Sequence, residues 1–158
     1  MGGKDHLGEP VTIAPVRAED EQDWLDMRCA LWPESPSDEH AGEIAAILGA
    51  PGRTLTLMAR AGNGEALGFA EASVRHDYVN GCLTSPVAFL EGIYVKDEAR
   101  RHGVARRLVS AVEAWALERG YSELASDALL DNAGSHAMHD ALGFEETGRV
   151  VYFRKGLG

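Results

Sequence analysis

The stretch FLEGIYVKDEARRHGVARRLVSAVEAW, from Phe89 to Trp115, decides the fold of this chain. The apolar run over residues 87–95 predicts a buried strand, and the segment after Gly103 predicts a helix. The apolar side chains of that helix recur every three or four residues, at Val104, Leu108, Val112 and Trp115. This spacing gives the helix one apolar stripe, with which it can pack against a sheet.

The turn between strand and helix, Arg100-x-x-Gly103-x-Ala105, is suited to an anion. It places backbone N–H groups at a helix N-terminus, where the positive end of the helix dipole favours a pyrophosphate. Gly103 lets the backbone approach the anion, and the small Ala105 keeps side-chain bulk away. Arg100, Arg101 and Arg106 add positive charges. Taken alone, the hexapeptide fits a solvated basic turn better, and the rest of the chain decides between the two.

The remaining chain mixes predicted strands and helices, so the predicted fold class is α+β with a mixed sheet. We expect strands at residues 11–16, 54–60, 65–75 and 122–127, and one or two final strands at residues 144–155. Helices are expected at residues 18–31, from Ser37 to Leu48, and after the turn at residues 131–135. The parallel strands should meet at the anion site.

Length and composition indicate one soluble globular domain. The chain has 158 residues, of which 45% are hydrophobic and 25% charged. We expect residues 1–10 to be a disordered leader and residues 11–158 to form a single domain. With no apolar run near twenty residues and no signal-peptide pattern, the expected location is the cytoplasm, with no membrane partner. Cys29 and Cys82 lack metal-ligand spacing and are expected to have no chemical role.

The formal net charge of −10 argues against nucleic acid as a partner, because phosphate binding needs a basic face. A negative surface steers cations inward and so suits a cationic substrate, although acidic proteins are also simply soluble. The basic cluster at residues 100–107 stands out against this background. The contrast fits an anionic cofactor and a cationic substrate.

The motif Arg/Gln-x-x-Gly-x-Gly/Ala after a strand, with Ala-Leu-Gly-Phe at residues 141–144, resembles the GNAT family of acetyl-CoA-dependent N-acetyltransferases. The resemblance extends over residues 12–155. It implies a central mixed sheet of six to seven strands flanked by about four helices. It also implies direct transfer of an acetyl group from acetyl-CoA to an amine.

Five segments are similar to one subgroup, the bacterial aminoglycoside 6′-N-acetyltransferases. They are LWPE (31–34), RHDYVNG (75–81), SPVAFLEGIYV (85–95), ASDA (125–128) and ALGFEETGRVVYFRK (141–155). This resemblance implies an aminoglycoside antibiotic as substrate and a role in antibiotic resistance. It also implies a homodimer, for which the C-terminal strands could supply the interface.

The resemblance assigns the coenzyme to two regions. The pantetheine arm and the oxyanion are expected along the strand at Ile93, Tyr94 and Val95, where that strand splays from its neighbour. The pyrophosphate is expected at the cradle Arg100, Arg101, His102, Gly103, Val104, Ala105 and Arg106. Asn132 and Ser135 are expected to contact the coenzyme as well.

Trp32, Tyr78, Glu91 and Asp127 match residues that line the aminoglycoside site in the subgroup. Alternation along the strand predicts Glu91 on the same face as Ile93 and Val95. A carboxylate in an apolar strand is costly unless it is paired, so Glu91 is equally a catalytic base or half of a structural ion pair. Asp127 is either a turn cap or an anchor for the substrate ammonium.

His139 stands where many members of this family have a tyrosine, five residues before the Phe of the Gly-Phe pair. We expect it as the proton donor to the leaving thiolate, although a thiolate can also leave without much help. His136, His139 and Asp140 have a spacing that could bind metal, but no further ligand is evident, so no metal is predicted. Gly148 replaces an acidic residue found in some relatives.

Two alternatives to an aminoglycoside acetyltransferase remain. The acceptor could be another amine, such as a polyamine, a protein N-terminus or a small metabolite. The chain could instead be a non-catalytic acyl-CoA-binding module that regulates a partner. The carboxylates Glu91 and Asp127 favour an enzyme, because a module that only binds has no need of them.

Overall fold

The computed structural model describes residues 10–158, and residues 1–9 of the predicted leader lie outside the described part. The described chain forms one five-stranded sheet in the order β1-β2-β3-β4-β5. The strands are β1 (Thr12–Pro15), β2 (Thr54–Arg60), β3 (Ala66–Arg75), β4 (Val87–Val95) and β5 (Leu124–Ser126). The first four strands pair antiparallel, and β5 pairs parallel to β4. The predicted mixed sheet is confirmed, with five strands where six to seven were expected.

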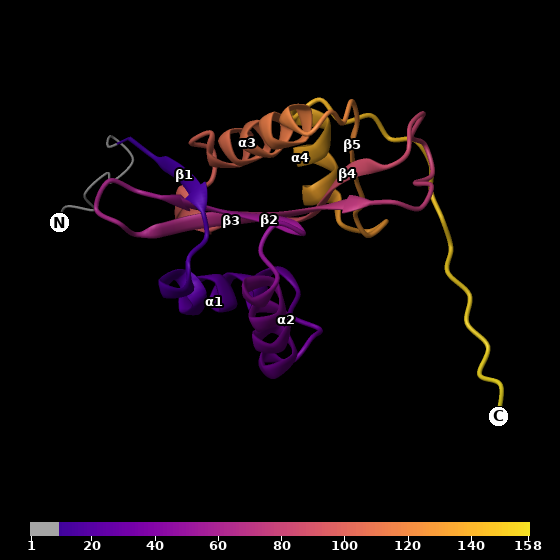
Figure 1. Ribbon diagram of the computed structural model, residues 1–158, viewed down its shortest axis with the longest axis horizontal. Helices are drawn as coiled ribbons and strands as arrows, with labels where there is room; N and C mark the ends of the chain where they lie inside the picture. Colours follow the sequence, from indigo (N-terminus) through magenta and orange to yellow (C-terminus); the bar gives the residue numbers. More distant parts are fainter. Residues whose placement is uncertain (1–9) are drawn as a thin grey trace.

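Helices cover both faces of this sheet. Helices α1 (Glu21–Leu31) and α2 (Ser37–Gly49) lie on one side, and α3 (Val104–Glu118) and α4 (Ala133–Ala141) lie on the other (Figure 1). Short 3-10 turns, Ala18–Asp20 and Asp97–Ala99, precede α1 and α3. The α+β fold class and the four helices agree with the sequence-based expectation.

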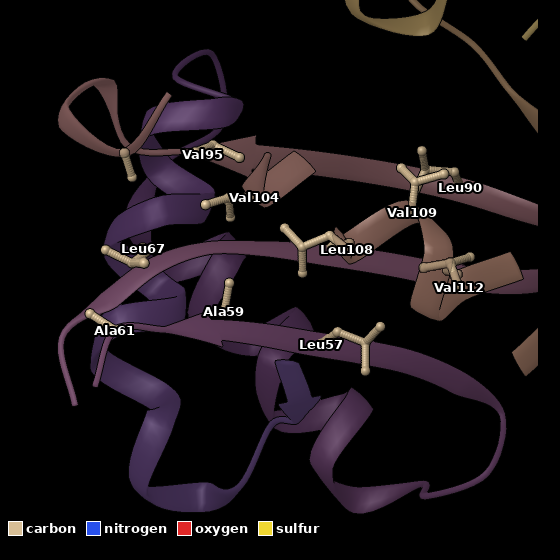
Figure 2. Close-up of a cluster of buried hydrophobic side chains, with 13 residues drawn as sticks. Leu57, Ala59, Ala61, Leu67, Leu90, Val95, Val104, Leu108, Val109 and Val112 are labelled. Carbon is tan, nitrogen blue, oxygen red and sulfur yellow. The ribbon is translucent and has the colours of Figure 1, made fainter. Parts of the chain in front are cut away.

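The larger hydrophobic core lies between the sheet and α3 (Figure 2). Val104, Leu108 and Val112 of the predicted stripe are buried there against Leu57 and Leu90 of the sheet, and Trp115 packs at the margin. Each fully buried aliphatic side chain contributes about 1.5–3 kcal/mol relative to exposure. A second core on the opposite face packs α1 and α2 against the sheet, through Trp24, Met27, Ile44, Met58, Ala66 and Phe69.

A β-bulge interrupts the pairing of β3 with β4. Gly92 is opposite Glu71 and Leu90 is opposite Ala72, so the intervening Glu91 has no partner on β3. A bulge reverses the alternation of side chains beyond it. Ile93 and Val95 therefore pack in the core beneath α3, whereas Glu91 bonds to side chains of β3 on the opposite face. The prediction that these three side chains share one face was wrong.

The strand β5 is short, and its pairing with β4 ends early. The register runs from Ala88 opposite Leu124 to Leu90 opposite Ser126, whereas β4 continues to Val95. In the described chain, the β5 edge of residues 91–95 therefore lies without a neighbouring strand. The ladder between β4 and β5 ends after Leu90, and the splay that the family resemblance implied at residues 93–95 stays a prediction.

The predicted final strands at residues 144–155 were wrong. The described chain carries no strand after β5, and residues 145–158, here named the C-terminal segment, are exposed throughout. Figure 1 shows this segment leaving the body of the molecule in an extended path. The sequence VVYF has the composition of a strand, but a strand also requires a neighbour with which to exchange backbone hydrogen bonds.

Candidate active site

Glu91 is fixed by two side chains of β3. Its Oε1 accepts from Ser73 Oγ at 2.5 Å and from Arg75 Nε at 3.1 Å, and its Oε2 accepts from Arg75 Nη2 at 2.8 Å. The guanidinium carbon of Arg75 lies 3.7 Å from the ring centroid of Phe89. These contacts fix the orientation of the Glu91 carboxylate in the bulge. They also pair its negative charge with Arg75, a cation of the same sheet.

Asp127 directly follows β5 and is exposed. The hydrogen bond that Arg75 donates to Glu91 raises the pKa of Arg75 above its ordinary value, and the negative charges of Glu91 and Asp127 add to that effect. Both predicted acids therefore act on one guanidinium, Glu91 by direct contact and Asp127 by its charge.

Trp32 follows α1 and lies against the bulge. A Cβ atom at Gly92 would stand 2.5 Å from Cζ2 of the Trp32 ring, so glycine is required there for the ring to fit. The ring also stacks on His40 at a centroid distance of 6.2 Å and meets Phe69 edge-on at 6.4 Å. Trp32 and Glu91 line the same open cavity of about 550 Å³, which lies between α1, α2 and the sheet.

A buried polar network supports the inner wall of this cavity. Glu71, 7% exposed, accepts from Trp24 Nε1 at 2.7 Å and from Arg28 Nη1 at 2.5 Å. Arg28, 4% exposed, also pairs with Glu43, and its guanidinium lies 4.9 Å from the centroid of the Trp32 ring. The network therefore carries charge directly beneath Trp32.

Glu71 and His40 are two groups of this wall whose protonation depends on their contacts. Burial raises the pKa of Glu71, and the charge of Arg28 together with the hydrogen bonds from Trp24 and Arg28 opposes that shift. His40 Nδ1 lies 3.4 Å from Arg28 Nε, which can only donate, and its Nε2 lies 3.0 Å from the Trp32 carbonyl oxygen, which can only accept. These partners assign the Nε2–H tautomer to His40.

Tyr78 lies in the loop between β3 and β4 and is 67% exposed. The described residues that line the cavity include Trp32 and Glu91 but neither Tyr78 nor Asp127. The structure thus brings together two of the four residues predicted for the acceptor. Asp127 acts on Arg75 through its charge alone, and Tyr78 lies on the surface.

The turn before α3 has the backbone expected of an anion cradle. Gly103 has φ 79° and ψ 10°, and Arg101 has φ 65°, so both adopt the left-handed conformation. A Cβ at Gly103 would meet no heavy atom within 4 Å, so the space beside it is open. The first helical bond runs from Arg107 N to Gly103 O, so helix geometry directs the N–H groups of residues 104–106 outward.

The basic side chains around the cradle have different partners. Arg100 Nε donates to Val95 O at 3.0 Å, and its Nη1 lies 2.9 Å from Asp97 Oδ1, so this side chain ties the end of β4 to the turn. Arg106 Nη2 donates to Ala141 O at 3.0 Å, at the end of α4. Arg101 and His102 are exposed beside the cradle.

The residues predicted on α4 are linked to the end of β5. Asn132 caps α4, its Oδ1 accepting from Ser135 N at 3.1 Å. His139 Nδ1 lies 2.7 Å from Ser135 O, and His139 Nε2 lies 2.7 Å from Ser126 Oγ. His139 therefore reaches the point where β4 and β5 separate through the hydroxyl of Ser126.

Two further features of the described residues concern metals and membranes. Within residues 10–158, no three His, Cys, Asp or Glu side chains lie close enough together to hold a metal ion. In the same part of the chain, no helix is long and apolar enough to cross a membrane.

Several polar residues of this region were missed in the sequence. Glu71 carried the same signal as Glu91, a carboxylate inside an apolar strand, and could have been singled out on that ground. Arg28 lies on the buried face of α1, and its charged end is buried as well. Ser73, Arg75 and Ser126 carried no local signal, because their partners lie on other elements.

Comparisons with known proteins agree with this geometry. The model of the acetyltransferase (GNAT) family matches residues 19–144. The chain is 52% identical over 135 residues to an aminoglycoside N(6′)-acetyltransferase type 1 of Serratia marcescens, covering 85% of this chain and 92% of that protein.

Two crystal structures are similar over nearly the whole chain. One is the aminoglycoside antibiotic 6′-N-acetyltransferase AAC(6′)-Ih of Acinetobacter baumannii, with 49% identity and a TM-score of 0.88, covering 94% of this chain and all of that one. The other is AAC(6′)-Iy in complex with a bisubstrate analogue, CoA-S-monomethyl-acetylneamine. It has 44% identity and a TM-score of 0.87, with the same coverage.

Proposed function

This chain belongs to the acetyltransferase (GNAT) family, and on that premise we propose that it transfers the acetyl group of acetyl-CoA to the 6′-amine of an aminoglycoside. One observation carries the proposal. Glu91 immediately follows the last residue of β4 that pairs with β5, and its side chain lines the cavity beside Trp32. A carboxylate thus stands where the coenzyme opening and a cavity for a cationic acceptor meet.

The cradle fits the coenzyme. Outward N–H groups at the start of α3, two left-handed residues and the open space beside Gly103 suit a pyrophosphate. The unpaired edge of β4 after Leu90 offers Ile93, Tyr94 and Val95 to the pantetheine amides in the manner of an added strand. The same edge supplies the proposed N–H group for the oxyanion.

Glu91 and Asp127 have complementary roles in this proposal. An aliphatic amine is mostly an ammonium ion at neutral pH, and only its neutral form attacks a thioester. Glu91, held in one orientation by Ser73 and Arg75, takes the proton of the amine through a water. Asp127 anchors a second ammonium group, and Trp32 provides an apolar wall. Tyr78, exposed in the loop between β3 and β4, adds a contact to the ligand, and His139 is the source of the proton for the departing thiolate.

The experiment for the activity is a panel of amines, assayed for thiol release from acetyl-CoA. Aminoglycosides with a 6′-amine should react, and analogues with a 6′-hydroxyl should not. Polyamines, peptides with a free N-terminus and uncharged amines complete the panel. A preference for any of these amines over aminoglycosides would show that the acceptor is another amine. If the protein binds the coenzyme but turns over no amine, it would be a non-catalytic binding module.

The proposed location is the cytoplasm, and both cysteines of the chain are unpaired, as in reducing compartments. A protein that confers antibiotic resistance would act there on drug that has entered the cell. We propose no nucleic acid partner, since the net charge is −10.

We also propose that the protein is a homodimer in which each copy contributes its C-terminal segment to the other. Val151, Tyr152 and Phe153 are between 76% and 93% exposed, an unusual density of apolar surface. The segment is already extended, and a strand edge of a second copy would supply the hydrogen bonds that it lacks.

Sedimentation of the full chain and of a variant without residues 145–158 tests this proposal. The full chain should sediment as a dimer, and the truncated chain and Val151→Asp should sediment as monomers. Leu83→Asp is the matched control, because Leu83 is 95% exposed but lies outside the segment. A monomeric full chain, or a truncated chain that remains dimeric, would contradict the proposal.

A further inference from the structure

We propose that the hydroxyl of Ser126 is a further catalytic group, which passes a proton from His139 to the sulfur of the departing thiolate. The inference rests on the acetyl transfer proposed above. Without this role, Ser126 would only connect β5 to α4 through its hydrogen bond with His139.

Ser126 lies at the end of the ladder between β4 and β5. Ser126 is the last residue of β5, and its partner across the ladder is Leu90, the last residue of β4 before the opening. Its Oγ lies 3.3 Å from Leu90 O. Ser126 therefore stands at the closed end of the opening in which the thioester is proposed to lie.

His139 stands directly behind this hydroxyl. Its Nδ1 lies 2.7 Å from the carbonyl oxygen of Ser135, which can only accept, so Nδ1 carries a hydrogen. In the neutral ring, Nε2 then has a lone pair and accepts from the Ser126 hydroxyl at 2.7 Å. When the ring is protonated, the direction reverses, because Nε2–H donates to Oγ and the hydroxyl turns its own hydrogen toward another acceptor.

The elements around His139 fix the position of its ring. His139 lies in the last turn of α4. Phe144 meets the ring edge-on at 5.0 Å and holds its plane. The other titratable or charged groups on the elements around it include His136 and Asp140 of α4, Asp127 after β5, and Arg106 of α3, which bonds to the end of α4.

Glu91 first takes one proton of the ammonium and releases it to bulk water. The neutral amine nitrogen then forms a bond to the thioester carbon and gives up its extra proton toward Glu91, and the carbon–sulfur bond breaks with its electron pair on sulfur. The sulfur takes the hydrogen of the Ser126 hydroxyl, and Ser126 Oγ takes the hydrogen of His139 Nε2. His139 is left neutral, still bonded to Ser135, and regains its proton from water because it is only half-buried.

Single-turnover thiol release, with bound acetyl-CoA and excess acceptor, tests the role of the hydroxyl. Ser126→Ala should slow this step by about 10- to 100-fold, the low end for general acids, because a thiolate is a good leaving group. The affinities for acetyl-CoA and acceptor should stay unchanged. Ser126→Thr keeps a hydroxyl and should restore most of the rate, and Ser122→Ala is the matched control on the exposed approach to β5.

A double-mutant cycle tests the link to His139. His139→Gln should slow the same step as much as Ser126→Ala, and the double variant should be no slower than either, since both changes cut one path. The slow variants should also lose the solvent deuterium isotope effect of the wild type on this step. Additive losses would show that the two residues act separately and would overturn the proposal.

A measurement without coenzyme or turnover completes the test. Nitrogen-15 NMR of the histidine rings, with His139→Gln to assign the signal, should show Nδ1–H and an Nε2 that accepts a hydrogen bond. Ser126→Ala should shift that Nε2 signal alone. An unshifted signal, or single-turnover release at the wild-type rate in Ser126→Ala, would overturn the inference. An inactive wild type would instead count against the proposed function.

Discussion

Arg75 donates to both carboxylate oxygens of Glu91, with Nη2 2.8 Å from Oε2 and Nε 3.1 Å from Oε1. A bidentate pair of this kind fixes the plane of the carboxylate as well as its distance. Because Glu91 sits in a bulge, the regular ladder does not fix its direction, and Arg75 supplies that constraint from the neighbouring strand.

We therefore expect Arg75→Met to lower kcat by about 10- to 100-fold, the scale on which small misplacements of catalytic groups act. The KM for acetyl-CoA should not change, since the cradle lies elsewhere. Steady-state kinetics of this variant and of Arg53→Met, an exposed arginine outside the site, make the comparison. Equal kcat in the two variants would show that Glu91 needs no such support.

The two acids should separate in kinetics. Glu91→Gln should lower kcat by about 100-fold or more, because the amine loses its proton acceptor, and the basic limb of the pH–rate profile should change. Asp127→Asn should act mainly on the KM of the acceptor, raising it about 10-fold or more for the loss of a charged hydrogen bond. If Glu91→Gln keeps its turnover while Asp127→Asn loses it, the two assignments are reversed.

Gly103→Val should remove acetyl-CoA binding beyond detection in calorimetry or weaken it strongly. The residue has φ 79°, and an added side chain would stand in the open space where the pyrophosphate is proposed. Gly120→Val is the matched control, because Gly120 has φ 84° and open space beside it but lies beyond the other end of α3. Both variants should lose similar stability. Equal coenzyme affinity in the two variants would show that the turn at Gly103 does not bind the pyrophosphate.

Arg28→Met should destabilise the protein by about 3–5 kcal/mol, because it leaves the carboxylate of Glu71 buried without its cation. Arg17→Met is the comparison, since Arg17 pairs with Glu19 in solvent and such pairs contribute about 0–1 kcal/mol. Urea unfolding of both variants gives the two numbers. A loss below 1 kcal/mol for Arg28→Met would mean that Glu71 finds other partners or is protonated in the native state.

The stability that Glu71 confers should depend on pH in a stated direction. Burial raises the pKa of Glu71 above its ordinary value of 4.5, so the native state keeps a proton that the unfolded chain has already released. Stability from this group is then fully present below pH 4.5 and is lost as pH rises through the native pKa.

Glu71→Gln has no such titration. The difference in unfolding free energy, wild type minus Glu71→Gln, should therefore fall as pH rises from 4.5 and level off above the native pKa. Urea unfolding of both proteins across this range measures it. A difference that grows with pH would show that Arg28 and Trp24 outweigh burial at this carboxylate.

The sequence predicted correctly those features that depend on residues within a single helix or strand. The stripe of α3 follows from neighbours within four residues, so the helix was predicted correctly, whereas the coenzyme cradle before it stays a prediction. The bulge was not predicted, because the alternation rule assumes a regular pleat and nothing in LEGIY marks an extra residue. The face assigned to Glu91 was wrong for that reason alone.

Contacts between distant parts of the chain escaped prediction for a different reason. Glu71 and Arg28 are 43 residues apart, and no periodicity links them. Ser126 and His139 meet only because β5 and α4 are folded together. The strand-like composition of the C-terminal segment was recognised, but composition does not say where the partner of a strand is, and within residues 10–158 this segment pairs with no strand.

The bulge at Glu91 has a consequence for how such an enzyme can be altered. Leu90 and Gly92 are already opposite consecutive residues of β3, so a chain that lacked Glu91 would have an uninterrupted ladder with every other pairing unchanged. The sheet and the carboxylate are thus separable by the loss of a single codon. With Glu91 as the proposed base, the loss of this one residue would give a catalytically silent relative that keeps the core and the turn before α3, and the reverse insertion would add the carboxylate to a protein that only binds.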